Sequence, residues 1–168
     1  LGAVLEVAAG KTLDQVLNER IFEPLGMDDT SFYLSSDKSG RIAEPNFGAM
    51  ADNTRVRAML SGGGGLNSTT EDYVRFAEML LWGGEYRGAR IIEQSTLDLM
   101  REKRIGSEVS REFFFYGETG DWGLGFHLQP TTEDPDGPHN FGWRGIGGTL
   151  FLVDEENDFY MIYMEQKR

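Results

Sequence analysis

The hydrophobic positions at the start of the chain follow the three- and four-residue spacing of an amphipathic helix. This stripe covers residues 1–9 and is followed by Gly10, a residue type that commonly ends helices. A second helix is predicted from Thr12, because Gln15 lies three positions later as in a capping box, and it is expected to end near Pro24. Helical patterns therefore dominate the beginning of the chain.

The clearest helical stripe lies near the middle of the chain. It follows Ser68 and Glu71, which together match a capping box, and it runs to Leu81 before a pair of glycines. A shorter helix is predicted through Met100, with Ser95 as its capping residue.

After about residue 112 the hydrophobic period changes to that of a β-strand. Residues 122–128 alternate large apolar side chains with glycine or histidine, which predicts one strand with a single buried face. Two continuous apolar runs follow, at 149–153 and 159–164. The acidic segment between them has turn-forming residues, so the two runs are predicted to form an antiparallel hairpin.

The predicted fold class is α+β, an antiparallel sheet packed with helices. Residues 1–111 are expected to be mainly helical and loop, and residues 112–168 to form antiparallel strands. The two runs of the hairpin are apolar on both faces, so both faces of the sheet should be covered. The helices of this chain can cover one face. We infer that the other covering element lies outside the chain or comes from a second subunit.

Composition narrows the function classes. The 39% of hydrophobic residues and 12% of aromatic residues suit a folded domain. Asp and Glu number 28 against 16 Lys and Arg, and the net charge of −12 disfavours binding to nucleic acid or anionic lipid. No run reaches the roughly 18 to 20 apolar residues of a membrane helix. The chain has no cysteine, which excludes thiolate catalysis and cysteine-ligated zinc.

A catalytic triad, a metal site and a nucleotide-binding loop each have little support in the sequence. A Ser-His-Asp triad is open in principle, but His127 alternates away from the buried face of its predicted strand and His139 lies in a Pro/Gly/Asp-rich loop. Both are therefore expected at the surface, and neither has a partner at metal-ligand spacing. The glycines of 62–65 and 142–148 lack the flanking residues and elements of nucleotide-binding loops, which favours turns and close packing.

Four stretches, taken in order, carry a family resemblance. They are Leu1–Glu6 continuing into Ile21–Thr30, Gly64–Thr69 with Asp72, Arg75 and Phe76, Trp122–Phe126, and Gly142–Thr149 continuing into Asp154. Each is short, but the ordered set covers almost the whole chain. It resembles the serine β-lactamase-like family, which includes class C β-lactamases, DD-peptidases and related esterases. The resemblance implies part of a β-lactamase/transpeptidase-like fold.

In that family the nucleophile is the Ser of a Ser-x-x-Lys motif, and a Tyr in Tyr-x-Asn or Tyr-x-Ser assists proton transfer. Both motifs lie upstream of the segment that residues 1–10 resemble. The resemblance therefore implies that this chain is a C-terminal segment without the nucleophile and is inactive by itself. It also implies no cofactor and no metal, and it is compatible with a periplasmic or secreted parent protein.

The third family motif is Lys-Thr-Gly in β-lactamases and often Trp-x-Gly or His-x-Gly in esterase-like members. Trp143-Arg144-Gly145 resembles it. The resemblance places Gly145 beside the catalytic cleft, makes Trp143 and Arg144 candidates for substrate binding, and makes the backbone N–H of Ile146 one of two oxyanion donors. Because side chains alternate along a strand, only one of Trp143 and Arg144 can face the cleft.

The departure from Lys-Thr-Gly bears on the substrate. In β-lactamases the Lys and Thr hold the antibiotic's carboxylate. Trp143 cannot fill that role, whereas Arg144 could if its side chain faced the cleft. We therefore favour esterase-like or peptidase-like acyl transfer over β-lactam hydrolysis, with an ester, amide or β-lactam as the small-molecule substrate. The expected partner is the missing N-terminal part of the same protein or a second subunit. The alternative is a non-catalytic binding or structural module that keeps the same fold.

Overall fold

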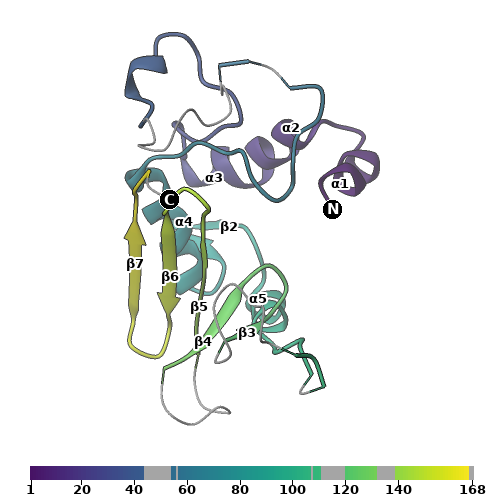
Figure 1. Ribbon diagram of the computed structural model, residues 1–168, viewed down its shortest axis with the longest axis vertical. Coiled ribbons are helices and arrows are strands. Elements are labelled where there is room, and N and C mark those ends of the chain that lie inside the picture. Colours follow the sequence, from purple (N-terminus) through teal and green to yellow (C-terminus); the bar gives the residue numbers. More distant parts are fainter. Residues whose placement is uncertain (44–53, 56, 107, 111–119, 132–138, 167–168) are drawn as a thin grey trace. The chain divides into compact units, whose positions relative to one another are not determined.

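The computed structural model describes residues 1–43, 54–55, 57–106, 108–110, 120–131 and 139–166 (Figure 1). The chain divides into two compact units. The first comprises Leu1–Phe76, Ile146–Gly148 and Met164–Arg168, and the second comprises Ala77–Gly145 and Thr149–Tyr163.

The first unit opens with the two predicted helices. Helix α1 spans Gly2–Ala9 and ends at Gly10, whose φ of 64° is left-handed. Helix α2 (Leu13–Leu17) starts at Thr12, where the Thr12 amide donates to Gln15 Oε1 at 3.2 Å. The helical path continues through a π-helical turn, η1 (Asn18–Phe22), and α3 (Glu23–Leu25). The π-turn precedes Pro24, which has no N–H to donate to the helix.

The first unit buries apolar side chains that include Phe22, Leu25 and Met27. Leu13, Phe32 and Leu60 form a buried cluster, and Leu17 and Tyr33 pack against it. The apolar stripe predicted on residues 1–9 forms a helix as expected, but its larger side chains stay exposed and only its glycine is buried.

Helix α4 spans Thr70–Leu81 and confirms the clearest helical prediction. Its cap differs from the predicted Ser68–Glu71 box. Thr69 Oγ1 accepts the amide of Asp72 at 3.2 Å. The Ser68 hydroxyl is instead 2.7 Å from the hydroxyl of Thr30. The helix therefore starts one residue later than the capping-box pattern indicated.

The second unit contains a hairpin that the periodicity did not reveal. Strands β1 (Glu85–Tyr86) and β2 (Ala89–Arg90) pair antiparallel across a two-residue turn. Helix α5 follows at Gln94–Met100, and Glu93 rather than the predicted Ser95 occupies its N-cap position.

A five-stranded antiparallel sheet makes up most of the second unit, with strand order β3-β4-β5-β6-β7 (Figure 1). The strands are β3 (Asp121–Trp122), β4 (His127–Pro130), β5 (His139–Arg144), β6 (Leu150–Asp154) and β7 (Phe159–Tyr163). Strands β6 and β7 confirm the predicted hairpin, and the α+β class is confirmed. Residues 132–138, predicted as part of a loop, lie outside the described residues.

The prediction of one continuous strand over 122–128 is wrong. Trp122 pairs directly with His127, so the intervening residues turn the chain between β3 and β4. The turn is held against the end of α5, because the Leu124 amide donates to the carbonyl of Met100 at 2.8 Å. A Cβ on Gly123 would lie only 2.0 Å from that carbonyl oxygen, so this close approach requires glycine.

The two faces of the sheet differ in burial. One face carries Phe141, Phe151 and Val153, which are buried. On the outer face of β7, Phe159, Met161 and Tyr163 are 49%, 39% and 51% exposed. Among the described residues, every helix is too short or too polar to cross a lipid bilayer.

Candidate functional site

The strand that carries the predicted third motif extends past its neighbour. The register of β4 with β5 ends at the pair His127 and Gly142. Trp143 and Arg144 continue beyond that point and pair on the other side with residues of β6. The last two residues of β5 therefore have a strand partner on the β6 side but none in the β4 register.

Strand β5 ends in a tight turn at Gly145. The Gly145 amide donates to the Thr149 carbonyl at 2.8 Å and closes the connection to β6. A Cβ on Gly145 would lie 2.2 Å from Thr149 Oγ1, so glycine permits this packing. The side chain of Ile146 is 67% exposed. Its amide makes no hydrogen bond to another described residue.

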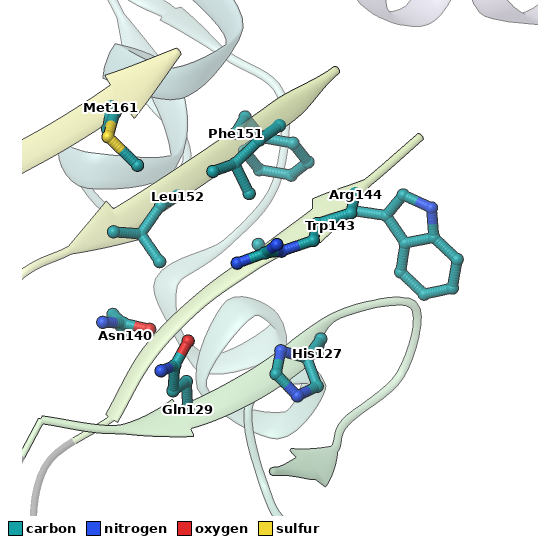
Figure 2. Close-up of a pocket in the computed structure, with 10 residues that line it drawn as sticks. His127, Gln129, Asn140, Trp143, Arg144, Phe151, Leu152 and Met161 are labelled. Atoms are coloured by element: carbon teal, nitrogen blue, oxygen red, sulfur yellow. The ribbon is translucent and has the colours of Figure 1, made fainter. Parts of the chain in front are cut away.

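Trp143 and Arg144 point in opposite directions from β5, as alternation along a strand requires (Figure 2). Trp143 is 44% exposed and meets the ring of Trp122 edge-on, with ring centroids 5.1 Å apart at an interplanar angle of 64°. Both residues contribute to the lining of a hollow at the sheet, and the Arg144 guanidinium extends to the side away from the Trp143 indole. The two candidate substrate-binding side chains therefore have different surroundings.

The hollow has a volume of about 230 Å³. Its polar lining comes from β4 and β5, and its apolar lining from β6, β7 and Trp143 of β5 (Figure 2). His127 lies in this lining. Partial burial lowers the pKa of His127, the positive charge of Arg144 lowers it further, and the carboxylate of Asp121 acts in the opposite direction.

The histidines are less exposed than predicted. His127 is half-buried, with its ring 5.4 Å from that of Trp122 at an angle of 67°. His139 is also half-buried and begins β5 opposite Pro130. Both lie in the sheet, whereas the sequence pattern placed His139 in a loop. The described residues contain no cluster of three or more acidic or histidine side chains that could hold a metal ion.

The Ser-x-x-Lys and Tyr-x-Ser patterns, which the resemblance places upstream of this chain, also both occur around Ser35. Tyr33-Leu34-Ser35 and Ser35-Ser36-Asp37-Lys38 overlap at that residue. Their surroundings differ from those of the family motif. Lys38 Nζ is 2.6 Å from Asp29 Oδ1 and donates to the Asp28 carbonyl at 3.1 Å. Ser35 interacts with the Asp37 carboxylate. Residues 36–38 form a turn that leads into a single 3-10 turn, η2 (Ser39–Arg41), whereas the Ser of the family motif stands at the start of a helix.

Trp122 was not identified from the sequence as a neighbour of the candidate site residue Trp143. Its stretch contributed to the family resemblance, but the period-two pattern assigned it only to a buried strand face. The contact with Trp143 depends on the register of three strands, which the local pattern does not encode.

The antiparallel sheet preceded by helices matches part of a β-lactamase/transpeptidase-like α+β fold. The β-lactamase family model matches residues 1–168, and the chain belongs to that family.

Its relatives include hydrolases and penicillin-binding proteins. Protein Rv1367c of Mycobacterium tuberculosis H37Rv is 31% identical over 189 residues, covering 99% of this chain and 46% of that protein. Penicillin-binding protein 4 of Amycolatopsis lactamdurans is 30% identical over 159 residues, covering 90% and 40%. The solved structure of EstCE1, described as a hydrolase with promiscuous acyltransferase activity, superposes with a TM-score of 0.77 at 22% identity, covering 99% of this chain and 49% of that one. The chain thus spans about half the length of the relatives that it matches.

Proposed function

We propose that residues 1–168 form the cleft-strand half of a serine hydrolase that works through an acyl-enzyme. The observation that carries the proposal is the end of β5. It runs past β4, turns at Gly145, and leaves the amide of Ile146 without a hydrogen bond to another described residue. Membership of the β-lactamase family supports the same chemistry.

In this proposal the Ile146 N–H donates to the carbonyl oxygen of the substrate. A serine hydroxyl from outside residues 1–168 attacks the carbonyl carbon, and negative charge develops on that oxygen. The C–O bond to the alcohol then breaks, and the alcohol leaves with the proton taken from the serine. Water repeats the sequence on the acyl-serine and releases the acid. Removing one such donor typically costs about 3 to 4 kcal/mol in the transition state.

Trp143 is the side chain that we assign to the cleft wall, and Arg144 is assigned to the opposite face of the strand. Their opposite directions and the packing of Trp143 against Trp122 support this choice. An indole offers no charge to hold a carboxylate. The proposal therefore favours an ester or peptide substrate over a β-lactam whose carboxylate must be bound at this motif.

The rest of the catalytic machinery is proposed to come from a part of the protein outside residues 1–168 or from a second subunit. The relatives are about twice as long as the matched segment. The same part is proposed to cover the outer face of β7, where Phe159, Met161 and Tyr163 are exposed. Apolar patches of this kind commonly mark interfaces.

The oxyanion assignment is tested by removing one N–H. In the product of the complete open reading frame that contains this chain, Ile146→Pro deletes the donor, while Ile146→Val keeps it and changes the side chain little. We expect Ile146→Pro to lower kcat for p-nitrophenyl esters by about 10²- to 10³-fold and Ile146→Val to stay near wild type. Equal activity of the two variants, with unchanged circular dichroism, would refute the assignment.

A further inference from the structure

We propose that Trp122 and Trp143 together form an apolar corner that selects esters with an apolar acyl chain, and that Trp122 is the positioning residue for Trp143. The inference rests on the proposed function and names the substrate class of that same site. Its starting point is the edge-on contact of the two indoles, 5.1 Å between centroids at 64°, with Trp143 44% exposed.

Trp122 is fixed in place by its backbone and by a second ring. Its carbonyl accepts the amide of Arg104 at 2.8 Å. Its own amide donates to Oδ1 of Asp121, a buried carboxylate, at 2.8 Å. Its ring also contacts His127, its partner in the β3–β4 register. Trp122 therefore has little freedom to move away from Trp143.

The turn that follows Trp122 is joined to the end of α5 through the carbonyl of Met100. The next residue, Arg101, forms an ion pair with Glu155, and its guanidinium lies over the ring of Phe141 at 5.2 Å from the centroid. Phe141 is buried in the sheet. Through these contacts, the turn that follows Trp122 is connected to the buried core of the second unit. A site held by such rigid elements keeps its geometry better than a site on a loop.

Strand β5 alone does not fix the indole of Trp143 in one direction. The Trp143 ring lies beyond the end of the β4 register and is 44% exposed. Without Trp122 the Trp143 side chain would lose a large apolar neighbour and gain access to other rotamers. Trp122 therefore holds Trp143 in place in addition to forming one side of the corner, and its loss should change selectivity more than basal turnover.

The chemistry of the corner determines what it accepts. The faces of an indole carry the negative part of its quadrupole, so they attract alkyl and cationic groups and disfavour carboxylates. Arg144, the nearest cation along the strand, points to the other face (Figure 2). An alkyl acyl chain packed in the corner should gain about fourfold in kcat/KM for each methylene removed from water.

The test compares p-nitrophenyl acetate with p-nitrophenyl butyrate, using the product of the complete open reading frame. The acyl chain differs by two methylenes while the leaving group stays the same. Wild type should prefer butyrate by roughly fifteenfold in kcat/KM. Trp122→Leu and Trp143→Ala should reduce this ratio to within about threefold of unity, and Trp122→Phe should restore most of it, because a phenyl ring keeps the edge contact.

Trp82 provides the matched control. It is 52% exposed and stacks on Tyr86 at 6.0 Å in the same unit, away from the end of β5 in sequence and register. Trp82→Leu removes an exposed indole of the same kind and should leave the ester ratio unchanged. A change in the ratio with Trp82→Leu equal to that with Trp122→Leu would contradict a specific role for Trp122.

Two further results would overturn the inference. If Trp122→Leu keeps the wild-type ratio, or lowers both esters by the same factor, Trp122 has only a structural role. A wild-type protein that cleaves neither ester and takes up no fluorophosphonate on serine would refute the proposed function, and this inference with it. An active wild type with an unchanged ratio in Trp122→Leu refutes only the inference.

Discussion

Asp72 and Thr30, which are 42 positions apart, share a buried hydrogen bond of 2.8 Å. The same carboxylate accepts the amide of Asp29 at 2.8 Å and pairs with Arg75 at 2.8 Å. Arg75 in turn donates to the carbonyl of Gly26. This network joins the start of α4 to the junction over residues 26–30, so two of the stretches that carry the family resemblance are in direct contact.

The network gives a stability prediction with an internal control. Asp72 is 3% exposed and Glu71 is exposed, yet both form ion pairs with Arg75. Asp72→Asn should destabilise the protein by about 2 to 4 kcal/mol, because it leaves buried donors poorly paired. Glu71→Gln should change the free energy of unfolding by less than about 0.5 kcal/mol. Urea unfolding measures the free energy of unfolding of both variants. Equal losses would show that the buried pairing of Asp72 stabilises the protein no more than the exposed pairing of Glu71.

The turn at Gly145 predicts a steric conflict that a second substitution relieves. Gly145→Ala places a methyl against Thr149 Oγ1 and should cost about 1 to 3 kcal/mol through overpacking. Thr149→Ala removes that oxygen, so the double variant should recover most of the loss. A double-mutant cycle in urea gives the coupling energy. Additive effects would mean that Thr149 is not the obstacle.

His127 predicts a stability change at mildly acidic pH. Partial burial and the charge of Arg144 lower the pKa of His127 in the folded protein, so the unfolded chain takes up the proton first as pH falls. The stability is fully present above the ordinary histidine pKa of about 6.5 and declines as pH falls through the lowered value.

Arg144→Gln should raise the pKa of His127 toward its ordinary value, because it removes a positive charge. The proton NMR shift of the imidazole reports the pKa directly. Trp fluorescence gives a second readout, because the His127 ring contacts Trp122. His127→Gln is the control and should abolish the transition. An unchanged midpoint in Arg144→Gln would show that Arg144 has no electrostatic effect on His127.

The exposed apolar side chains on the outer face of β7 lead to a prediction about an interface in the complete protein. If another part of the protein packs on this face, Met161→Lys introduces an unpaired charge into that interface and should cost at least about 2 kcal/mol in the complete protein. Glu156→Lys, an exposed position in the turn between β6 and β7, should cost less than about 0.5 kcal/mol. A neutral Met161→Lys would mean that the face stays open to water.

The elements with strong periodicity were predictable from sequence. Helices α1 and α4 and the β6–β7 hairpin form where their hydrophobic patterns predict them, although the apolar stripe of α1 stays exposed. Capping motifs predicted the first residues of the helices less reliably. The cap of α4 is Thr69 and not Ser68, because the Ser68 hydroxyl lies beside Thr30, a contact between distant residues that no local motif encodes.

The same limit explains the error at residues 122–128. Large apolar residues alternating with glycine suit one strand, but they also suit two short strands joined by a glycine turn. The carbonyl of Met100, more than twenty positions upstream, accepts the amide of Leu124 and decides between them. The Trp122–Trp143 contact was hidden for this reason, whereas the opposite directions of Trp143 and Arg144 followed from simple alternation.

The central claim is that this chain is the cleft-strand half of a serine acyl hydrolase. The most direct measurement is the intact mass, under denaturing conditions, of the complete open reading frame product before and after a fluorophosphonate probe. Residues 1–168 alone, prepared in the same way, serve as the control. The account predicts one adduct on a serine outside residues 1–168 and none on the isolated chain. An unmodified complete product, or an adduct on Ser35, would contradict it.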